Sequence, residues 1–293
     1  MNTLTRGDRW RRRAVIWLPY GWLLLFFLVP CLIVLKISLA DQAMGIPPYT
    51  PLIADGQIQA SIANYQFLTS DSLYFFAYGN ALLFSAGATL GCLLIGYPLA
   101  YGIVRAPLAW RNALLLLVIL PFWSSFLIRV YAWVGLLKGN GLVNNFLINI
   151  GLIHEPLALI NNAFAVYVGL IYSYLPYMVL PLYATLEKLD PALLEAASDL
   201  GCRPAQAFWR VTFPLSWPGV VAGSLLVFIP MCGEFIIPDL LGGPDNLMIG
   251  KVLWDEFFNN RDWPVASAVA VVMLVLLVVP MGFLRRFLTS DRA

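Results

Sequence analysis

The feature that most constrains this chain is a series of apolar runs, each long enough to cross a lipid bilayer. A spanning helix needs about 20 mainly apolar residues to cover roughly 30 Å of hydrocarbon. With 60% hydrophobic and only 12% charged residues, a water-soluble fold of this length would struggle to hide its apolar surface. The sequence therefore predicts an all-α integral membrane protein with six transmembrane helices, at about 14–37, 77–104, 112–137, 162–186, 217–241 and 265–288.

The charges predict how these helices are oriented. Most of the 18 Lys and Arg residues lie in the tails and loops on the same side as the N-terminus. Cytoplasmic loops carry an excess of such residues, so both termini are expected in the cytoplasm. The predicted organisation is a tail at 1–13, a single transmembrane domain at 14–288 and a tail at 289–293. A secretory signal is the alternative for the first run, but its length and two prolines favour a retained helix.

A polar segment separates the fourth and fifth runs, at residues 187–216, and is called the bent segment below. Asp190 before Pro191 is typical of a helix start, because the carboxylate caps the first turn and proline suits the first helical position. Gly201 can take the left-handed conformation that ends a helix. Pro204 is typical of a second start, and Pro214 is expected to stop that helix. Two short helices meeting at a glycine are predicted.

The side chains of the bent segment have the chemistry of a contact surface. Ala196 and Ala197 leave a low face that another protein can approach closely, and Glu195 and Arg203 flank it with opposite charges. Apolar anchors follow at Phe208, Trp209 and Val211. Two interpretations stay open from these residues: a plug that fits a groove on a partner, or an amphipathic linker on the membrane surface.

The stretch "EAASDLG", followed by "FWRVTFP", resembles the EAA loop of bacterial ABC importer permeases. The resemblance implies an ABC importer permease fold whose bent segment is a coupling helix, seated in a cleft of a cytoplasmic ATPase. The residues that carry the motif are Glu195, Ala196, Ala197, Gly201 and Pro214. We add Arg203 and Phe208 to the coupling residues.

Most of the remaining chain is similar to the spermidine/putrescine branch of these permeases, and most similar to its putrescine-type first permease. The stretches that carry this similarity include "LLLLVILPFWSSFLIRVYAWVGLLKGNGLVNNFL" (114–147), "GEFIIPDLLGGPDNLMIGKVLW" (233–254) and "EFFNNRDWPVASAVA" (256–270). The resemblance implies a multi-pass protein of the bacterial inner membrane that forms half of a polyamine path. Implied partners are a second homologous permease, two copies of a cytoplasmic ATPase, an extracytoplasmic polyamine-binding protein and membrane lipid, with no nucleic acid.

Candidate path residues are polar or aromatic side chains within the apolar runs, since polar groups are costly in lipid and usually face a cavity. Glu234 is the sharpest candidate, because Pro230, Gly233 and Pro238 loosen the helix around it. It is expected either to contact a polyammonium ion or to pair with a structural partner such as Arg129. Other candidates are Asp239, nearer the outer mouth, and the aromatics Trp123, Tyr131 and Trp133, which equally suit helix packing or an interfacial belt.

The sequence holds no motif for ATP binding and no residue set for catalysis. The nearest text to a phosphate-binding loop, "GPDNLMIGKV", has the wrong spacing and Val252 where Ser or Thr is required. His154 is predicted in a solvated loop, and the four cysteines show no metal or redox spacing. We therefore expect a transporter subunit without cofactor, metal or enzymatic activity, with ATP and Mg held by the partner ATPase. The alternative is a secondary polyamine or cation antiporter, which would leave the bent segment without a role.

Overall fold

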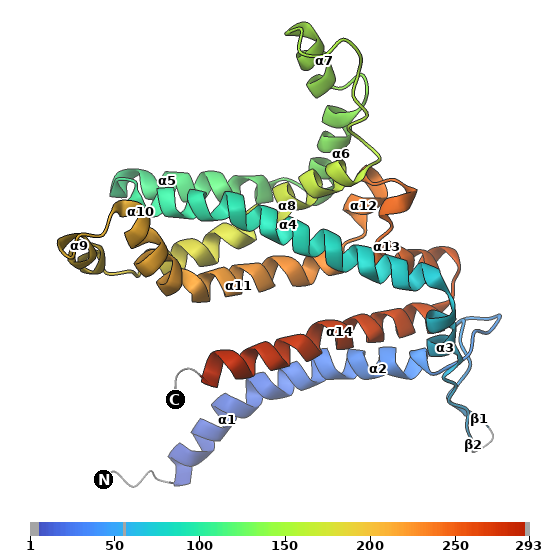
Figure 1. Ribbon diagram of the computed structural model, residues 1–293. Coiled ribbons are helices and arrows are strands. Elements are labelled where there is room, and N and C mark those ends of the chain that lie inside the picture. The colour runs from blue at the N-terminus through green and yellow to red at the C-terminus, as the bar shows by residue number, and fades with distance from the viewer. Residues whose placement is uncertain (1–5, 55–56, 291–293) are drawn as a thin grey trace. The chain divides into compact units, whose positions relative to one another are not determined.

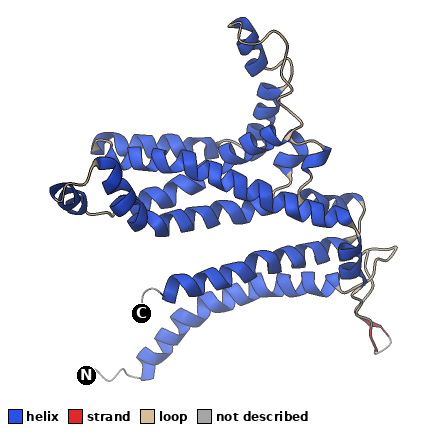
Figure 2. Ribbon diagram, in the orientation of Figure 1, coloured by secondary structure: helices blue, strands red, loops and turns tan. Residues whose placement is uncertain are grey.

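The computed structural model describes residues 6–54 and 57–290, and these residues are almost entirely helical (Figures 1 and 2). Within them, six helices are long and apolar enough to cross a membrane. The predicted all-α class with six candidate spans is therefore confirmed. One hairpin of two-residue strands, β1 (Ile53–Ala54) and β2 (Gln57–Ile58), is a small addition to that class. The predicted tails, 1–13 and 289–293, fall partly outside the described residues.

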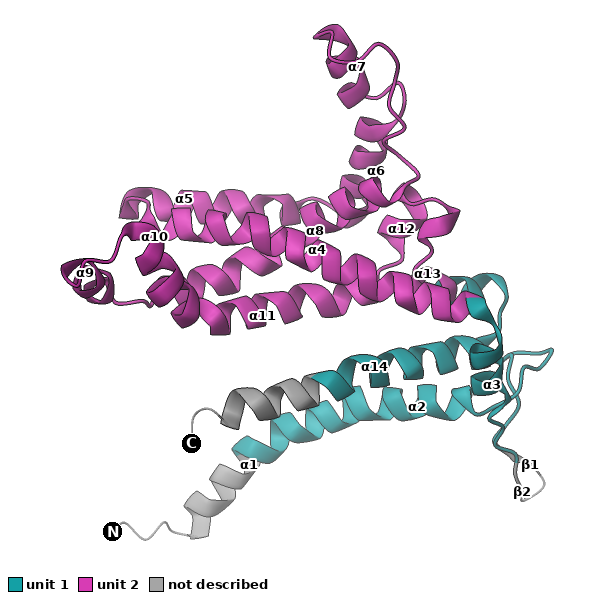
Figure 3. Ribbon diagram, in the orientation of Figure 1, with its two compact units in different colours: residues 1–72, 253–293 teal, residues 73–252 magenta. Residues whose placement is uncertain are grey.

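The chain divides into two compact units, residues 1–72 with 253–293 and residues 73–252 (Figure 3). In the first unit, α14 packs against α2 and α3. The buried Asn64 side chain donates to the carbonyls of Ser38 and Ala40, which holds α3 to the end of α2. The elements of this unit are α1 (Arg6–Leu23), η1 (Leu24–Leu28), α2 (Val29–Ser38), β1, β2, α3 (Ala63–Ser70), η5 (Asp255–Asn259) and α14 (Trp263–Ser290).

The second unit contains every candidate site residue. Its elements are α4 (Ser72–Arg105), α5 (Leu108–Ile119), η2 (Leu120–Trp123), α6 (Phe126–Leu137), α7 (Leu142–Asn149), α8 (Ala163–Leu186), α9 (Pro191–Asp199), α10 (Pro204–Ala207), η3 (Phe208–Thr212), α11 (Phe213–Cys232), α12 (Ile236–Leu241), η4 (Pro244–Asn246) and α13 (Ile249–Trp254).

Helix α8 is the core of the second unit, and α11 packs closely along it. Leu170, Met178 and Leu182 of α8 have no exposed surface. The close approach of α11 depends on Gly223, where a Cβ would lie 2.8 Å from the sulfur of Met178 and 3.2 Å from its carbonyl oxygen. Small residues at such contacts let helices pack by van der Waals attraction where lipid gives no hydrophobic drive.

Two of the predicted spans are interrupted. The run 112–137 is not one helix: α5 ends at Ile119, a short turn contains Pro121, and α6 begins at Phe126 after extended backbone at Ser124 and Ser125. The run 217–241 is likewise two helices, because α11 ends at Cys232 and α12 begins at Ile236. The second break falls at Gly233 and Glu234, where the sequence predicted a loosened helix, whereas the first was not predicted.

Several prolines lie inside helices instead of ending them, which corrects the expectation for Pro214. A π-helical turn, η3, precedes Pro214, and the amide of Phe213 donates to the carbonyl of Phe208. The same arrangement precedes Pro30, where the amide of Val29 donates to the carbonyl of Leu24. A wider turn accommodates the proline ring and its missing N–H, so the helix continues into α11.

Candidate functional site

Two candidate regions lie at opposite ends of α11 within the second unit (Figure 1). One is the bent segment, which contains α9 and α10. The other is residues 233–235, called the helix break below, between α11 and α12. Helix α11 has 20 residues and is therefore about 30 Å long, which matches the hydrocarbon thickness of a bilayer.

The start of α9 and the turn at Gly201 are as predicted, but the second helix is not short, because α10 continues through η3 into α11. The Asp190 carboxylate accepts from the amide of Ala192 at 3.0 Å and caps α9, which begins at Pro191. Gly201 has a φ of +81°. Its amide donates to Ser198, and the next amide, of Cys202, donates to Ala197. This pair of bonds is a Schellman motif, which requires a left-handed residue at the position of Gly201.

Most predicted coupling residues are exposed, with two exceptions. Exposed are Glu195, Ala196, Gly201, Arg203 and Pro214. Ala197 is buried, and Phe208 is half-buried against α4, its ring centre 5.6 Å from those of both Tyr97 and Tyr101 in edge-on contacts. The Phe208 ring thus makes contacts within the chain, and its role as an anchor for a partner stays a prediction. Trp209 is the aromatic residue that points outward, with 63% of its surface exposed.

Sequence reasoning missed an exposed leucine next to the glycine. Leu200 is 86% exposed at the end of α9, and Leu193 on the same helix is 46% exposed. An apolar residue directly before a helix-ending glycine was the available signal. Together with Trp209, these side chains give the bent segment an exposed apolar surface, which is typical of a protein contact or a membrane interface.

At the helix break, Glu234 is nearly buried, with 8% of its surface exposed. One carboxylate oxygen accepts from the Tyr174 hydroxyl at 2.6 Å, which ties the break to α8. The other accepts from the amides of Phe235 and Ile236 at 3.2 and 3.1 Å, at the start of α12. The sequence indicated Glu234, but its partner Tyr174 lies 60 residues away and carried no signal.

Arg129, the predicted alternative partner of Glu234, forms no ion pair with it in the part of the chain that the structure describes. The Arg129 guanidinium carbon instead lies 5.4 Å and 5.6 Å from the ring centres of Phe122 and Phe126. Its Nε and Nη1 atoms are buried and have no hydrogen-bond partner among the described residues. Buried donors of this kind are costly, so an acceptor from outside this chain would stabilise Arg129.

The three candidate aromatics lie in different environments. Trp123 and Tyr131 are 76% and 59% exposed, while Trp133 packs edge-on against Tyr172 of α8 at 5.4 Å. The aromatic side chain that donates to Glu234 is Tyr174, whose ring lies 5.9 Å from that of Tyr177. The structure thus brings Glu234 together with Tyr174 of α8, which sequence reasoning did not select.

Asp239 lies beside a polar cleft of about 350 Å³, lined by residues that include Asn161, Gly243, Pro244, Leu247 and Lys251. The Lys251 ammonium lies 3.1 Å from an Asp239 carboxylate oxygen. The lysine of this ion pair was not among the predicted site residues. The sequence signal for this pair was a lysine twelve positions after the aspartate, with a Gly-Gly-Pro stretch between them that can turn the chain back.

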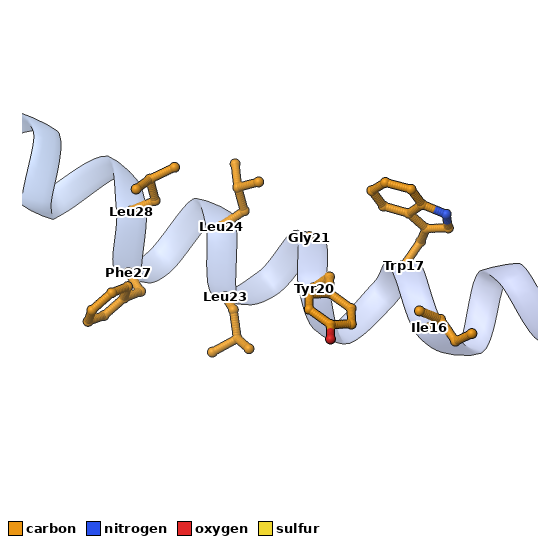
Figure 4. A pocket seen from close by; sticks show the side chains of 8 residues that line it. All are labelled: Ile16, Trp17, Tyr20, Gly21, Leu23, Leu24, Phe27 and Leu28. Atoms are coloured by element: carbon orange, nitrogen blue, oxygen red, sulfur yellow. The ribbon is translucent and has the colours of Figure 1, made fainter. Parts of the chain in front are cut away.

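Larger cavities in the first unit are apolar. One of about 510 Å³ follows α1 and η1, and Figure 4 shows that all of its lining side chains, from Ile16 to Leu28, come from this one helical stretch. Another, of about 470 Å³, lies between α2 and α14 and is lined by residues such as Leu28, Val34 and Leu274. Such surfaces suit lipid or another membrane helix and have no charged side chain in their lining.

A helical chain with six candidate spans, an exposed bent segment and a polar cleft at the far end of α11 has the features of a membrane transport subunit. Residues 6–291 match the family described as "Binding-protein-dependent transport system inner membrane component". The chain belongs to this family and is a multi-pass inner membrane permease component.

Its curated relatives are similar over nearly their whole length. The chain is 40% identical to the "Spermidine/putrescine transport system permease protein PotB" of Haemophilus influenzae, covering 92% of this chain and 91% of the relative. It is also 40% identical to the protein of that name from Escherichia coli, with 88% and 90% covered. Among solved structures, a chain of a bacterial ABC transporter involved in alginate import has a TM-score of 0.67 at 20% identity, with 96% of both chains covered. This last match supports the fold alone.

Proposed function

We propose that this chain is the transmembrane permease subunit of an ATP-driven importer of polyamines, putrescine or spermidine or both. The observation that carries the proposal is the 40% identity, over about nine-tenths of the chain, to permeases named for spermidine and putrescine transport. Both termini and the bent segment are placed in the cytoplasm, and the helix break and the polar cleft toward the outside. The basic residues of the tails and of the loop before α9 support this orientation.

The energy for transport comes, in this proposal, from a separate ATPase that grips the bent segment. Glu195, Ala196 and Arg203 supply an exposed face with both charges, and Leu200 and Trp209 supply apolar anchors. Phe208 acts from inside, since its ring contacts connect this face to α4, and Ala197 is buried beneath the face. This chain binds no ATP in this proposal, and the assembly includes a second permease, two ATPase copies and an extracytoplasmic binding protein.

The substrate path is proposed to include Glu234, Asp239 and the aromatics Trp123, Tyr131 and Trp133. A polyamine is a chain of ammonium groups, so it is attracted to carboxylates and to the faces of aromatic rings. In the described conformation Glu234 is covered by Tyr174. The carboxylate would therefore receive an ammonium only when α8 and the helix break move relative to each other. Such movement follows from ATP only if the partner ATPase binds the two states with different affinities.

ATP-dependent uptake tests this function directly. The permease pair and its ATPase are reconstituted in vesicles with ATP inside, and the binding protein and labelled putrescine are added outside. Uptake that requires both ATP and the binding protein is expected. Uptake that persists without ATPase but follows a proton gradient would support the antiporter instead. ATP-dependent uptake of other solutes with none of putrescine or spermidine would contradict the proposed substrate.

A further inference from the structure

The ion pair beside the polar cleft joins two short helices. Asp239 lies on α12 and Lys251 on α13, and their charged atoms are 3.1 Å apart. The two side chains differ in accessibility, because 45% of the aspartate surface but only 21% of the lysine surface is exposed. Asp239 therefore presents an open side to the cleft while Lys251 neutralises it from within the protein.

The exposure of Asp239 makes the pair exchangeable. An ion pair that water reaches contributes little net stability, because water solvates the separated charges well. The cleft of about 350 Å³ beside the pair has room for another cation to approach the carboxylate. A cation that arrives from the cleft can thus replace the lysine ammonium without opening the core of the unit.

The chemistry of Lys251 indicates which cation does this. A lysine side chain is a primary ammonium on a four-carbon stem, and it offers three N–H donors and no acceptor. A linear polyamine ends in the same primary ammonium. A carboxylate that accepts hydrogen bonds from the lysine ammonium is equally suited to accept them from the terminal ammonium of a polyamine.

We propose that Lys251 is an internal substitute for the terminal ammonium of the cargo. In the empty protein it occupies Asp239, and the cargo ammonium displaces it on entering the cleft. Because one primary ammonium replaces another on Asp239, net binding of the cargo stays weak. The cargo is therefore released when Lys251 returns to the carboxylate. This inference depends on the proposed function for its cargo and adds a residue, Lys251, that opposes binding.

The test compares Lys251→Met with Asp239→Asn in the reconstituted importer. Loss of the competing ammonium should lower KM for putrescine by about threefold and also lower Vmax, since cargo release is no longer assisted. Loss of the carboxylate should raise KM by a similar factor. Lys138→Met, which removes an exposed lysine from the turn after α6, is the matched control and should change neither constant. If both cleft variants raise KM, or if both only reduce the amount of assembled protein, the pair is structural and the inference is wrong.

Chemical restoration of the ammonium gives an independent measurement. In a chain whose four native cysteines are replaced by serine, Lys251→Cys should show the low KM. Aminoethyl methanethiosulfonate restores a primary ammonium of similar reach and should raise KM back to the parent value, while methyl methanethiosulfonate should not. A KM that is insensitive to aminoethylation contradicts the inference. If the parent importer takes up no polyamine at all, the proposed substrate is wrong rather than the exchange.

Discussion

The bent segment and the helix break both interrupt a helical path at a glycine, but they keep their shapes by different means. At the bent segment, Gly201 has a φ of +81°, and hydrogen bonds between residues at most five apart close the turn. At the helix break, Gly233 has an ordinary φ of −93°, and Glu234 is tied to Tyr174 on another helix. One region is held locally and the other by a long-range contact.

This difference indicates how each region moves. A locally closed turn with exposed side chains can be displaced as one piece, and under the proposed function the Phe208 ring would pass the displacement to α4 through Tyr97 and Tyr101. A break held by a contact between α8 and α12 changes when those helices shift. The bent segment is therefore suited to receive a push, and the helix break is suited to respond to it. Four predictions test this contrast.

The largest effect is expected for Gly201→Pro. Proline cannot adopt a positive φ, so the Schellman turn is lost at a cost of about 3 kcal/mol or more. ATP-dependent uptake should fall roughly 100-fold or more, since a 1.4 kcal/mol change is a factor of ten. Glu195→Lys, which reverses a charge on the exposed face, should also abolish coupling. Both proteins should remain in the membrane, as measured by immunoblot of the membrane fraction.

Gly151 provides the matched control for this variant. It has a φ of +72° in the loop after α7, and, like Gly201, it has no atom within 4 Å of where a Cβ would lie. Gly151→Pro therefore introduces the same local strain at a site without a proposed coupling role. If Gly151→Pro and Gly201→Pro reduce uptake equally, the bent segment has no special part in coupling.

The second prediction concerns Glu234→Gln and Tyr174→Phe. Hydrogen bonds to a charged group contribute about 1.5–3 kcal/mol, so each variant should reduce uptake by about tenfold. If Glu234 meets the cargo, Glu234→Gln should also raise KM, whereas Tyr174→Phe should change Vmax alone. Uptake with varied putrescine gives both constants, and chromatography of the purified complex checks assembly. Unchanged uptake in Glu234→Gln would exclude Glu234 from the path.

The same contrast explains how far the sequence alone could predict the molecule. Apolar run length predicted six candidate spans but misplaced the bounds of the third and fifth. The signals for Asp190, Gly201 and Pro204 were sufficient for the start of α9, the turn and the start of α10, because the hydrogen bonds there join near neighbours. The helix break and the polar cleft depend on Tyr174 and Lys251, whose contacts form only after the helices pack. The prediction that Pro214 ends the helix was wrong, because the π-turn before it accommodates the proline and the helix continues. A π-turn has no simple sequence signal.

A smaller effect is expected for Leu200→Ser. Full burial of a leucine side chain contributes about 1.5–3 kcal/mol, and partial burial against the ATPase should contribute less, so affinity should fall severalfold. Leu152→Ser is the matched control, since Leu152 is 71% exposed beside Gly151. Pull-down of the ATPase at graded concentrations measures the difference. Equal ATPase binding by the two variants would show that Leu200 lies outside the contact.

The smallest effect is expected for Asp190→Ala. Loss of a helix N-cap costs about 1 kcal/mol, which should increase amide hydrogen exchange of α9 about fivefold. Because the Schellman turn at Gly201 stays intact, the segment should keep its bend, and uptake should fall less than twofold. Asp190→Asn retains a cap acceptor and should behave as the parent chain. Faster exchange at the amides of Phe235 and Ile236 as well would contradict the claim that the two regions are held independently. It would mean that the helix break loses stability together with the bent segment.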